Sequence, residues 1–254
     1  MKDAFRLAIG TLTALPVSAP TEVDRGVARR AMLIAPVTAL PLAAVWLLGH
    51  VALRFTSVPM LVIRVLVVAS TALYSRGLHI DGLADTVDGL SASHDRERAL
   101  AVMKTGDIGP SGAAALFLVL LVQAVALGSL LTSTAGTLLA VLALLGSRQA
   151  LAWGCWSRVP VARPTGLGAG VGGVVPTRAL MAAGSVAVVV AAVASRLVGL
   201  SWYAGPLTVV VGVLGADYVL LTAIRRLGGM TGDVLGACVE VSLAAALVVA
   251  TVVR

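Results

Sequence analysis

Seven apolar stretches, each about as long as a membrane is thick, constrain the fold of this chain more than any other feature. A helix needs roughly 20 apolar residues to cross a bilayer. The stretches lie at approximately Met32–Leu53, Val58–Leu78, Gly112–Leu131, Gly136–Trp156, Ala179–Leu197, Trp202–Ile224 and Val234–Val253. Hydrophobic residues make up 59% of the 254 and charged ones 12%, whereas soluble domains have about 45–50% and about 25%. We therefore predict an all-α, polytopic transmembrane helical bundle of about seven spans, forming a single integral membrane domain over residues 1–254.

Two details refine this prediction near the N-terminus. Pro36 and Pro41 lie inside the first stretch, and proline kinks or breaks a membrane helix where other groups satisfy the freed backbone. Before that stretch, "AFRLAIGTLTAL" places Phe5, Ile9 and Leu12 at helical spacing. This pattern predicts a short helix at the membrane surface, with a re-entrant segment as the alternative.

The basic residues predict the orientation of the bundle. Cytoplasmic loops of membrane proteins carry an excess of Lys and Arg. With the N-terminus in the cytoplasm, every predicted cytoplasmic segment is basic, whereas the outer segments hold only Arg54, Arg196 and Arg254 and no acidic residue. The net charge of +7 is thus spread over loops, which argues against a nucleic-acid partner, since such proteins gather their basic residues on one face.

Three aspartates occur within eight residues in "HIDGLADTVDGL", in a chain that is otherwise poor in acid. If this segment is helical, Asp81, Asp85 and Asp88 lie within about 60° of one another on one face. Carboxylates grouped in this way repel one another unless a cation joins them, and hard oxygen ligands suit Mg²⁺. Gly82 leaves room for a ligand to approach the backbone. The alternative is a solvated acidic face, with the neighbouring His79 in a structural role.

A second acidic block, "RRLGGMTGDVLGACVE", begins the last apolar stretch. Asp233 is expected at the cytoplasmic mouth of that span, either as a helix cap or as a metal ligand. Glu240 lies two turns further in, where an unpaired carboxylate is costly. It is therefore either a ligand, paired with a buried arginine such as Arg148, or protonated.

Both blocks resemble those of a known family. "LHIDGLADTVDGLSASHDRERALAVMK" and "RLGGMTGDVLGACVE", with "TLTALPV" and "ARPTGLG", are similar to motifs of the cobalamin synthase family, the adenosylcobinamide-GDP ribazoletransferases. The resemblance covers most of the chain. It implies a Mg²⁺-dependent transferase of the cell inner (plasma) membrane with its active site facing the cytoplasm. The implied reaction is attack of the hydroxyl of α-ribazole, or of its 5′-phosphate, on adenosylcobinamide-GDP, with release of GMP.

The resemblance, together with the chemistry of phosphoryl transfer, assigns roles to individual residues. The predicted catalytic residues are Asp81, Asp85, Asp88 and His79. The predicted substrate-binding residues are Lys104, Arg226, Thr231, Gly82 and Arg163. The predicted metal ligands are Asp81, Asp85, Asp88, Asp233 and Glu240. The expected partners are the two small-molecule substrates and membrane lipid, and a homo-oligomer is left open.

Two other function classes compete with this prediction. A transporter would use intramembrane charges such as Asp217, Glu240 and Arg148, but most acidic residues of this chain gather at one predicted face. A CDP-alcohol phosphotransferase runs the same type of reaction with a lipid product. Its aspartate pattern includes an Ala-Arg step that "DGLADTVDG" lacks.

Overall fold

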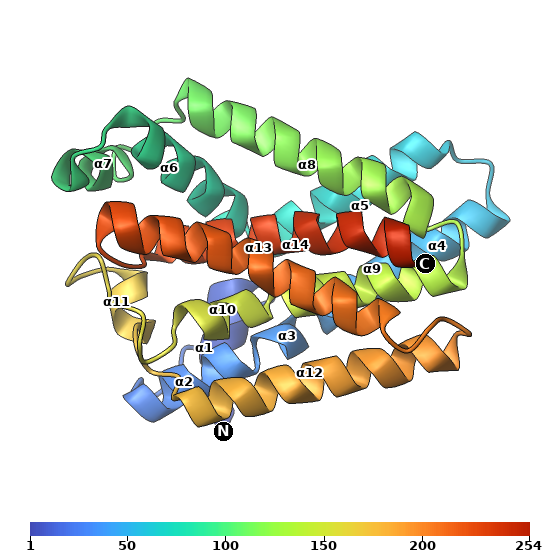
Figure 1. Ribbon diagram of the computed structural model, residues 1–254, viewed down its shortest axis with the longest axis horizontal. Helices are drawn as coiled ribbons and strands as arrows, with labels where there is room; N and C mark the ends of the chain where they lie inside the picture. The colour runs from blue at the N-terminus through green and yellow to red at the C-terminus, as the bar shows by residue number, and fades with distance from the viewer.

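The computed structural model describes residues 1–254 and consists of helices joined by short connections (Figure 1). The helices are α1 (Lys2–Leu12), α2 (Arg25–Leu33), α3 (Ala35–Thr38), α4 (Leu40–Phe55), α5 (Met60–Tyr74), α6 (Leu78–Ala92), α7 (Arg96–Val102), α8 (Pro110–Leu130), α9 (Thr134–Ser147), α10 (Gln149–Gly154), α11 (Leu167–Val171), α12 (Thr177–Leu197), α13 (Ala204–Leu227) and α14 (Gly232–Val253). The prediction of an all-α membrane bundle is confirmed.

Five helical segments are long and apolar enough to cross a membrane: α8, α9 with α10, α12, α13 and α14. They correspond to the last five predicted spans. The first two predicted spans do not form single long helices, so the structure supports five spans, or six if the bent pair α5 and α6 is taken as one.

The first predicted span is broken into α2, α3 and α4. The breaks fall at Ile34 and Ala39, and a proline stands in the first turn of each helix that follows, Pro36 in α3 and Pro41 in α4. Proline has no N–H to donate and its fixed φ suits the first turn of a helix. The predicted break at these prolines is confirmed.

The second predicted span, Val58–Leu78, ends early because the chain turns. Helix α5 stops at Tyr74, and α6 leaves it at an angle of 86°. Arg76 and Gly77 occupy the left-handed region at the turn, with φ of 54° and 77°; the conformation is natural for glycine and uncommon for arginine. Because α6 has 15 residues and contains three aspartates, we place it outside the membrane-spanning part of the bundle.

Helix α14 lies at the centre of the bundle and packs against α13, α6, α9 and α8. Small residues let these backbones approach, as is usual where helices pack in lipid. Gly212 and Gly215 of α13, for example, face Ser242 and Ala245 of α14. Near the N-terminus, α1 packs Ala4, Ala8 and Leu12 into the bundle, so the segment predicted at the membrane surface is a helix that supports the core.

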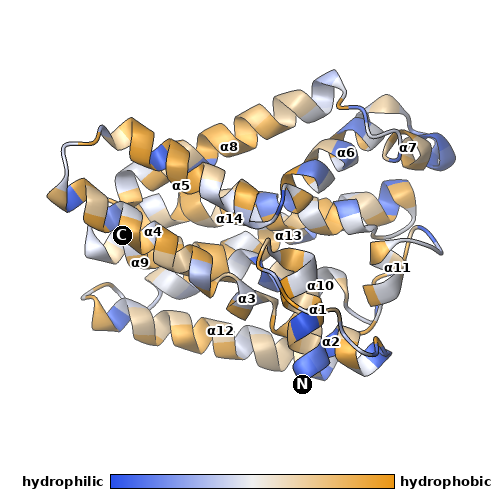
Figure 2. Cartoon of the chain, turned by 180° about the vertical axis from the view of Figure 1, so that it is seen from behind, coloured by the Kyte–Doolittle hydropathy of each residue, from blue (hydrophilic) through white to orange (hydrophobic).

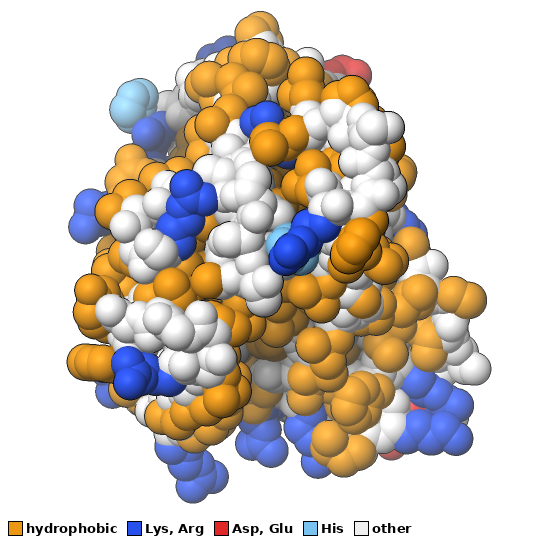
Figure 3. All heavy atoms as spheres, turned by 90° about the vertical axis from the view of Figure 1, so that its right-hand side faces the viewer, with side chains coloured by type: hydrophobic (Ala, Val, Ile, Leu, Met, Phe, Trp, Pro, Cys, Tyr) orange, Lys and Arg blue, Asp and Glu red, His pale blue; other side chains and the backbone are white.

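The two ends of the bundle differ in character. Helices α1, α2, α7 and α11 gather at one end, and the α4–α5, α8–α9 and α12–α13 connections lie at the other (Figure 1). Hydrophilic residues concentrate at the first end (Figure 2). Seen from the second end, the surface is largely hydrophobic or uncharged with scattered Lys and Arg, and acidic side chains are visible only at its margin (Figure 3). The acidic helix α6 therefore belongs to the end where the predicted cytoplasmic segments meet.

Candidate functional site

The two acidic blocks, far apart in the sequence, meet where α6 packs against the first turns of α14. A Cβ atom on Gly82 would lie 2.5 Å from the carbonyl oxygen of Asp233, and one on Gly236 would lie 3.0 Å from that of His79. The two helices therefore touch backbone to backbone. This contact places Asp81 and Asp85 of α6 beside Asp233.

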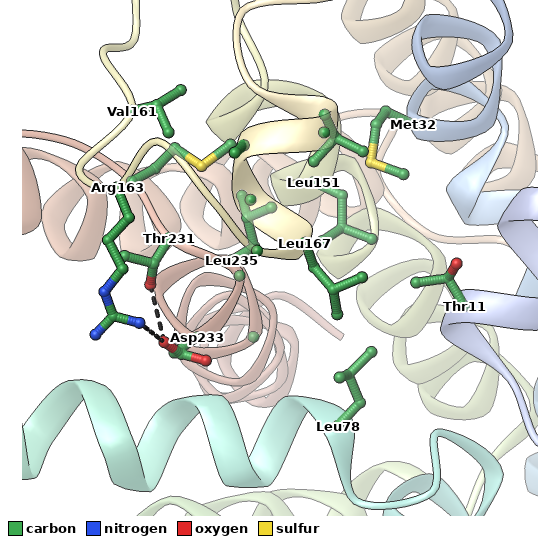
Figure 4. Close-up of a pocket in the computed structure, with 18 of the residues that line it drawn as sticks. Thr11, Met32, Leu78, Leu151, Val161, Arg163, Leu167, Thr231, Asp233 and Leu235 are labelled. Carbon is green, nitrogen blue, oxygen red and sulfur yellow. Dashed lines mark hydrogen bonds and ion pairs between the residues drawn. The ribbon is translucent and has the colours of Figure 1, made fainter. Parts of the chain in front are cut away.

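Asp233 is held at the mouth of α14 by two neighbours. The Thr231 hydroxyl accepts a hydrogen bond from the Val234 amide and donates one to Asp233 Oδ2 at 3.1 Å. Arg163 Nη1 lies 3.5 Å from the same oxygen (Figure 4). Thr231 is thus the helix cap, which leaves the other oxygen of Asp233 free for a ligand.

Asp81 and Asp85 lie beside Asp233 without partners of their own. Asp81 is exposed and Asp85 is half-buried. Partial burial and the carboxylates of Asp81, Asp233 and Asp88 together raise the pKa of Asp85 from the usual 3.8 to about 6. A cation would relieve this repulsion, since an opposite charge favours the ionised form. The group is therefore suited both to binding cations and to taking up a proton near neutral pH.

Asp88, predicted as a third equivalent carboxylate, has a different role in the structure. Its oxygens accept hydrogen bonds from the backbone amides of Gly109 at 2.7 Å and Gly112 at 2.8 Å, and its side chain is 8% exposed. These amides belong to the start of α8, whose free N–H groups favour a carboxylate. Asp88 thus fastens α8 to α6, and its role as a metal ligand stays a prediction.

Glu240 also lies apart from the other acidic residues. It is 2% exposed, and Gln123 Nε2 of α8 donates to its Oε2 at 2.8 Å. The carboxylate is therefore satisfied inside the bundle, two turns below Asp233. A single site with five acidic ligands is not what the structure shows, because Asp88 and Glu240 serve helix packing.

Two predicted substrate-binding residues make packing contacts, and a third is exposed to solvent. Arg226 Nη2 donates to the carbonyl oxygens of Leu90 and Ser93 and thereby closes the end of α6. Gly82 is covered by the Asp233 backbone and offers no space to a ligand. Lys104 is exposed on the turn after α7. Of the predicted substrate-binding set, Arg163, Thr231 and Gly82 lie at the aspartates, and only Arg163 and Thr231 offer side chains there.

A cavity of about 420 Å³ opens beside Asp81 and Asp233. Arg163, Thr231 and Asp233 lie on one side of it, and Leu151, Leu167 and Met32 lie across from them (Figure 4). His79 lines the same cavity; it is 1% exposed, and neither ring nitrogen has a hydrogen-bond partner. The volume is within the usual range for a small-molecule site, about 300–1,000 Å³.

Part of this cavity was not expected from the sequence. The segment Thr165–Val171, which reads as a flexible glycine-rich loop, forms one wall and includes α11. Gly166 has a φ of 98°, which few other residues adopt. Gly168 packs on Thr231 and Gly232 so closely that a Cβ would lie 2.7 Å from the Gly232 nitrogen. The "ARPTGLG" motif was the available signal that this loop belongs to the site.

The free aspartates suit a magnesium ion that is completed by other ligands. No three acidic, His or Cys side chains lie close enough together to hold a metal ion by themselves. Mg²⁺ commonly takes one or two carboxylates and fills its remaining positions with water and substrate phosphate. Asp81 and Asp85, whose carboxylates have no competing partner, fit that description better than a cage made of protein alone.

Comparison with known proteins gives one consistent result. A family described as cobalamin-5-phosphate synthase matches residues 4–251. A protein of Nocardioides sp. is 46% identical over 249 residues, covering 97% of both chains. Relatives from Frankia casuarinae (40% identical; 96% of this chain and 92% of the relative) and Pseudomonas fluorescens (33%; 93% of each) also align. All three are named adenosylcobinamide-GDP ribazoletransferase.

No solved structure matches the chain. The family assignment therefore rests on the sequence matches, which extend over nearly the whole chain and include both acidic blocks that the fold joins. The chain belongs to the cobalamin-5-phosphate synthase family.

Proposed function

We propose that the protein is a transferase of cobalamin biosynthesis that joins adenosylcobinamide phosphate, taken from adenosylcobinamide-GDP, to α-ribazole or its 5′-phosphate. GMP is released and adenosylcobalamin, or its phosphate, is formed. The names of the relatives support this reaction. The structural observation that carries it is the meeting of Asp81 and Asp85 with Asp233 and Arg163 beside a small-molecule cavity.

The residues divide the work of phosphoryl transfer, which consists mainly of positioning and of balancing charge. The ribazole hydroxyl oxygen forms a bond to the phosphorus that carries the corrinoid, and the bond from that phosphorus to the GMP oxygen breaks. An aspartate that does not bind the metal takes up the hydroxyl proton. His79, whose ring nitrogens have no partner, is the other candidate base. Arg163 binds oxygens of the diphosphate, since a guanidinium suits two-point contact with phosphate.

Magnesium completes the proposed chemistry. Asp81 and Asp85, with Asp233 near them, would hold Mg²⁺. The metal would neutralise part of the charge of the diphosphate. The distribution of basic residues supports an orientation with this end of the bundle in the cytoplasm. We therefore place the active site on the cytoplasmic face of the cell inner (plasma) membrane.

The test is a reaction with purified protein in detergent or lipid nanodiscs. Adenosylcobinamide-GDP, α-ribazole and Mg²⁺ should yield GMP and the joined corrinoid in equal amounts, and omission of either ribazole or Mg²⁺ should abolish both products. A CDP-alcohol offered in place of the corrinoid should release no CMP. Absence of GMP under all these conditions would refute the proposal.

A further inference from the structure

Two cavities flank the first turn of α6, and they share only Leu78 and Asp81. The first is the cavity of about 420 Å³ described above. The second, of about 510 Å³, is more open and lies between the α5–α6 turn, α6 and α8. Its lining includes Arg76, Ile80 and Leu116. Two substrates that react with each other must meet at one point, and Asp81 is the polar residue that both cavities share.

The first cavity is suited to an uncharged aromatic ligand. Half of its lining residues are apolar, Leu7, Leu12 and Leu167 among them, and Thr11, His79 and Thr165 are polar groups that also line it. A guanine base has several hydrogen-bonding groups on its edge, and burying them against the apolar residues leaves them unpaired, which is costly. The dimethylbenzimidazole ring of α-ribazole has one free nitrogen and two methyl groups, so it loses few hydrogen bonds when it is buried there.

The second cavity offers a positive charge and no acidic residue besides Asp81. Arg76 is exposed, and its Nη2 donates to the Gly10 carbonyl oxygen at 2.7 Å. That bond uses one of the five N–H donors of a guanidinium. Arg76 also has a φ of 54°, an uncommon conformation that costs free energy and often marks a functional position. The wider opening admits a ligand too large to be enclosed.

We propose that the two substrates bind in different cavities, an inference that rests on the transferase function proposed above. The first cavity holds the ribazole acceptor, and the second receives the diphosphate of the corrinoid donor. Arg76 binds the phosphate next to the guanosine in the second cavity, and the reacting phosphorus lies beside Asp81, where the cavities meet and Arg163 approaches from the first cavity. The apolar part of the lining favours this division over the opposite one, with guanosine in the first cavity, because fewer polar groups of a benzimidazole need partners there.

Steady-state kinetics with two single substitutions test this division. Arg76→Ala should raise the KM for adenosylcobinamide-GDP by about tenfold or more, because a charge-assisted contact to phosphate is lost, while the KM for ribazole stays within about twofold. Leu167→Ala should raise the KM for ribazole about tenfold, because apolar contact is lost. It should leave the KM for adenosylcobinamide-GDP within about twofold. Arg76→Lys should recover part of the donor affinity. Arg98→Ala, an exposed arginine that lines neither cavity, is the control and should change neither KM.

Measurement of ribazole binding distinguishes a failure of this division from a failure of the proposed function. By calorimetry without donor, the unmodified protein and the Arg76→Ala variant should bind α-ribazole equally, and Leu167→Ala should bind it about tenfold more weakly. If GMP release occurs but Arg76→Ala weakens ribazole, or weakens both substrates equally, the division is wrong. If the protein binds ribazole as expected but never releases GMP, the proposed function fails, whereas the assignment of ribazole to the first cavity stands.

Discussion

Asp81, Asp85 and Asp88 share a helical face, yet only the Asp88 side chain has hydrogen-bond partners in the structure. The i, i+4 and i+3 spacing correctly places them together on α6. It could not show that the amides of Gly109 and Gly112 hold Asp88, because that contact depends on where α8 begins. For the same reason, the sequence predicts Arg226 as a substrate-binding residue, although in the structure it closes the end of α6. Spacing within a helix predicts a face, and the partners of that face come from elsewhere in the chain.

Substitution of each aspartate should therefore give two kinds of result. Asp81→Asn and Asp85→Asn should each lower kcat/KM by at least about 100-fold, since charge stabilisation in phosphoryl transfer is lost, with an unchanged melting temperature or a higher one. Asp88→Asn should instead lower the melting temperature, because a buried acceptor of two amide hydrogen bonds is weakened, at a cost of about 1–3 kcal/mol. Thermal unfolding in detergent, measured beside turnover, distinguishes the two. A stable, inactive Asp88→Asn variant would return Asp88 to the catalytic group.

The raised pKa of Asp85 predicts a pH-dependent stability effect. Folding raises this pKa from 3.8 to about 6, so the ionised carboxylate is disfavoured in the folded state. The resulting loss of stability is absent below about pH 4, grows as the pH rises and is complete above about pH 6 to 7. Without added metal, Asp85→Asn should raise the melting temperature at pH 8 and leave it unchanged at pH 4. Asp107→Asn, on the exposed loop before α8, is the control; an equal gain for both variants at pH 8 would contradict the argument.

At the scale of helices, the sequence predicts correctly the helices whose boundaries are set by local signals such as proline. The prolines at positions 36 and 41 mark real breaks. The five later spans form because their apolar stretches are long, although Arg148 divides one of them into α9 and α10. The turn between α5 and α6 was missed because Arg76, a residue that rarely adopts positive φ, occupies it. The structure of this turn depends on packing of α6 against α14, which no local pattern records.

The contact between α6 and α14 gives a prediction at this scale. Gly82→Ala should separate the two helices, because its Cβ would lie 2.5 Å from the Asp233 carbonyl oxygen. We expect a lower melting temperature and a loss of turnover. Gly184→Ala in α12 is the matched control, since a Cβ there meets no atom within 4 Å, and alanine favours a helix by about 1 kcal/mol over glycine. A Gly82→Ala variant as stable and active as Gly184→Ala would show that the close packing is not required.

At the scale of the whole molecule, the distribution of charge predicts the orientation in the membrane. Ser91 at the end of α6 and Thr132 between α8 and α9 are both exposed and lie at opposite ends of the bundle. The natural Cys155 and Cys238 are buried and should not react. In intact cells, an impermeant thiol reagent should therefore label a Thr132→Cys variant and spare Ser91→Cys. The reverse pattern would place the aspartates on the outer side and overturn the proposed orientation.

The meeting of two distant segments is the central feature of this structure, and we propose that they form one transferase site. Asp81 lies on α6, Asp233 begins α14, and the packing of these helices is what unites them. The most direct measurement is the initial rate of GMP release from adenosylcobinamide-GDP and ribazole by the unmodified protein and by an Asp233→Asn variant. We predict steady release by the first and a loss of at least about 100-fold in the second, matching Asp81→Asn, with both variants folded. Near-normal release by folded Asp233→Asn would mean that α14 only supports the fold and that the two acidic blocks do not form one site.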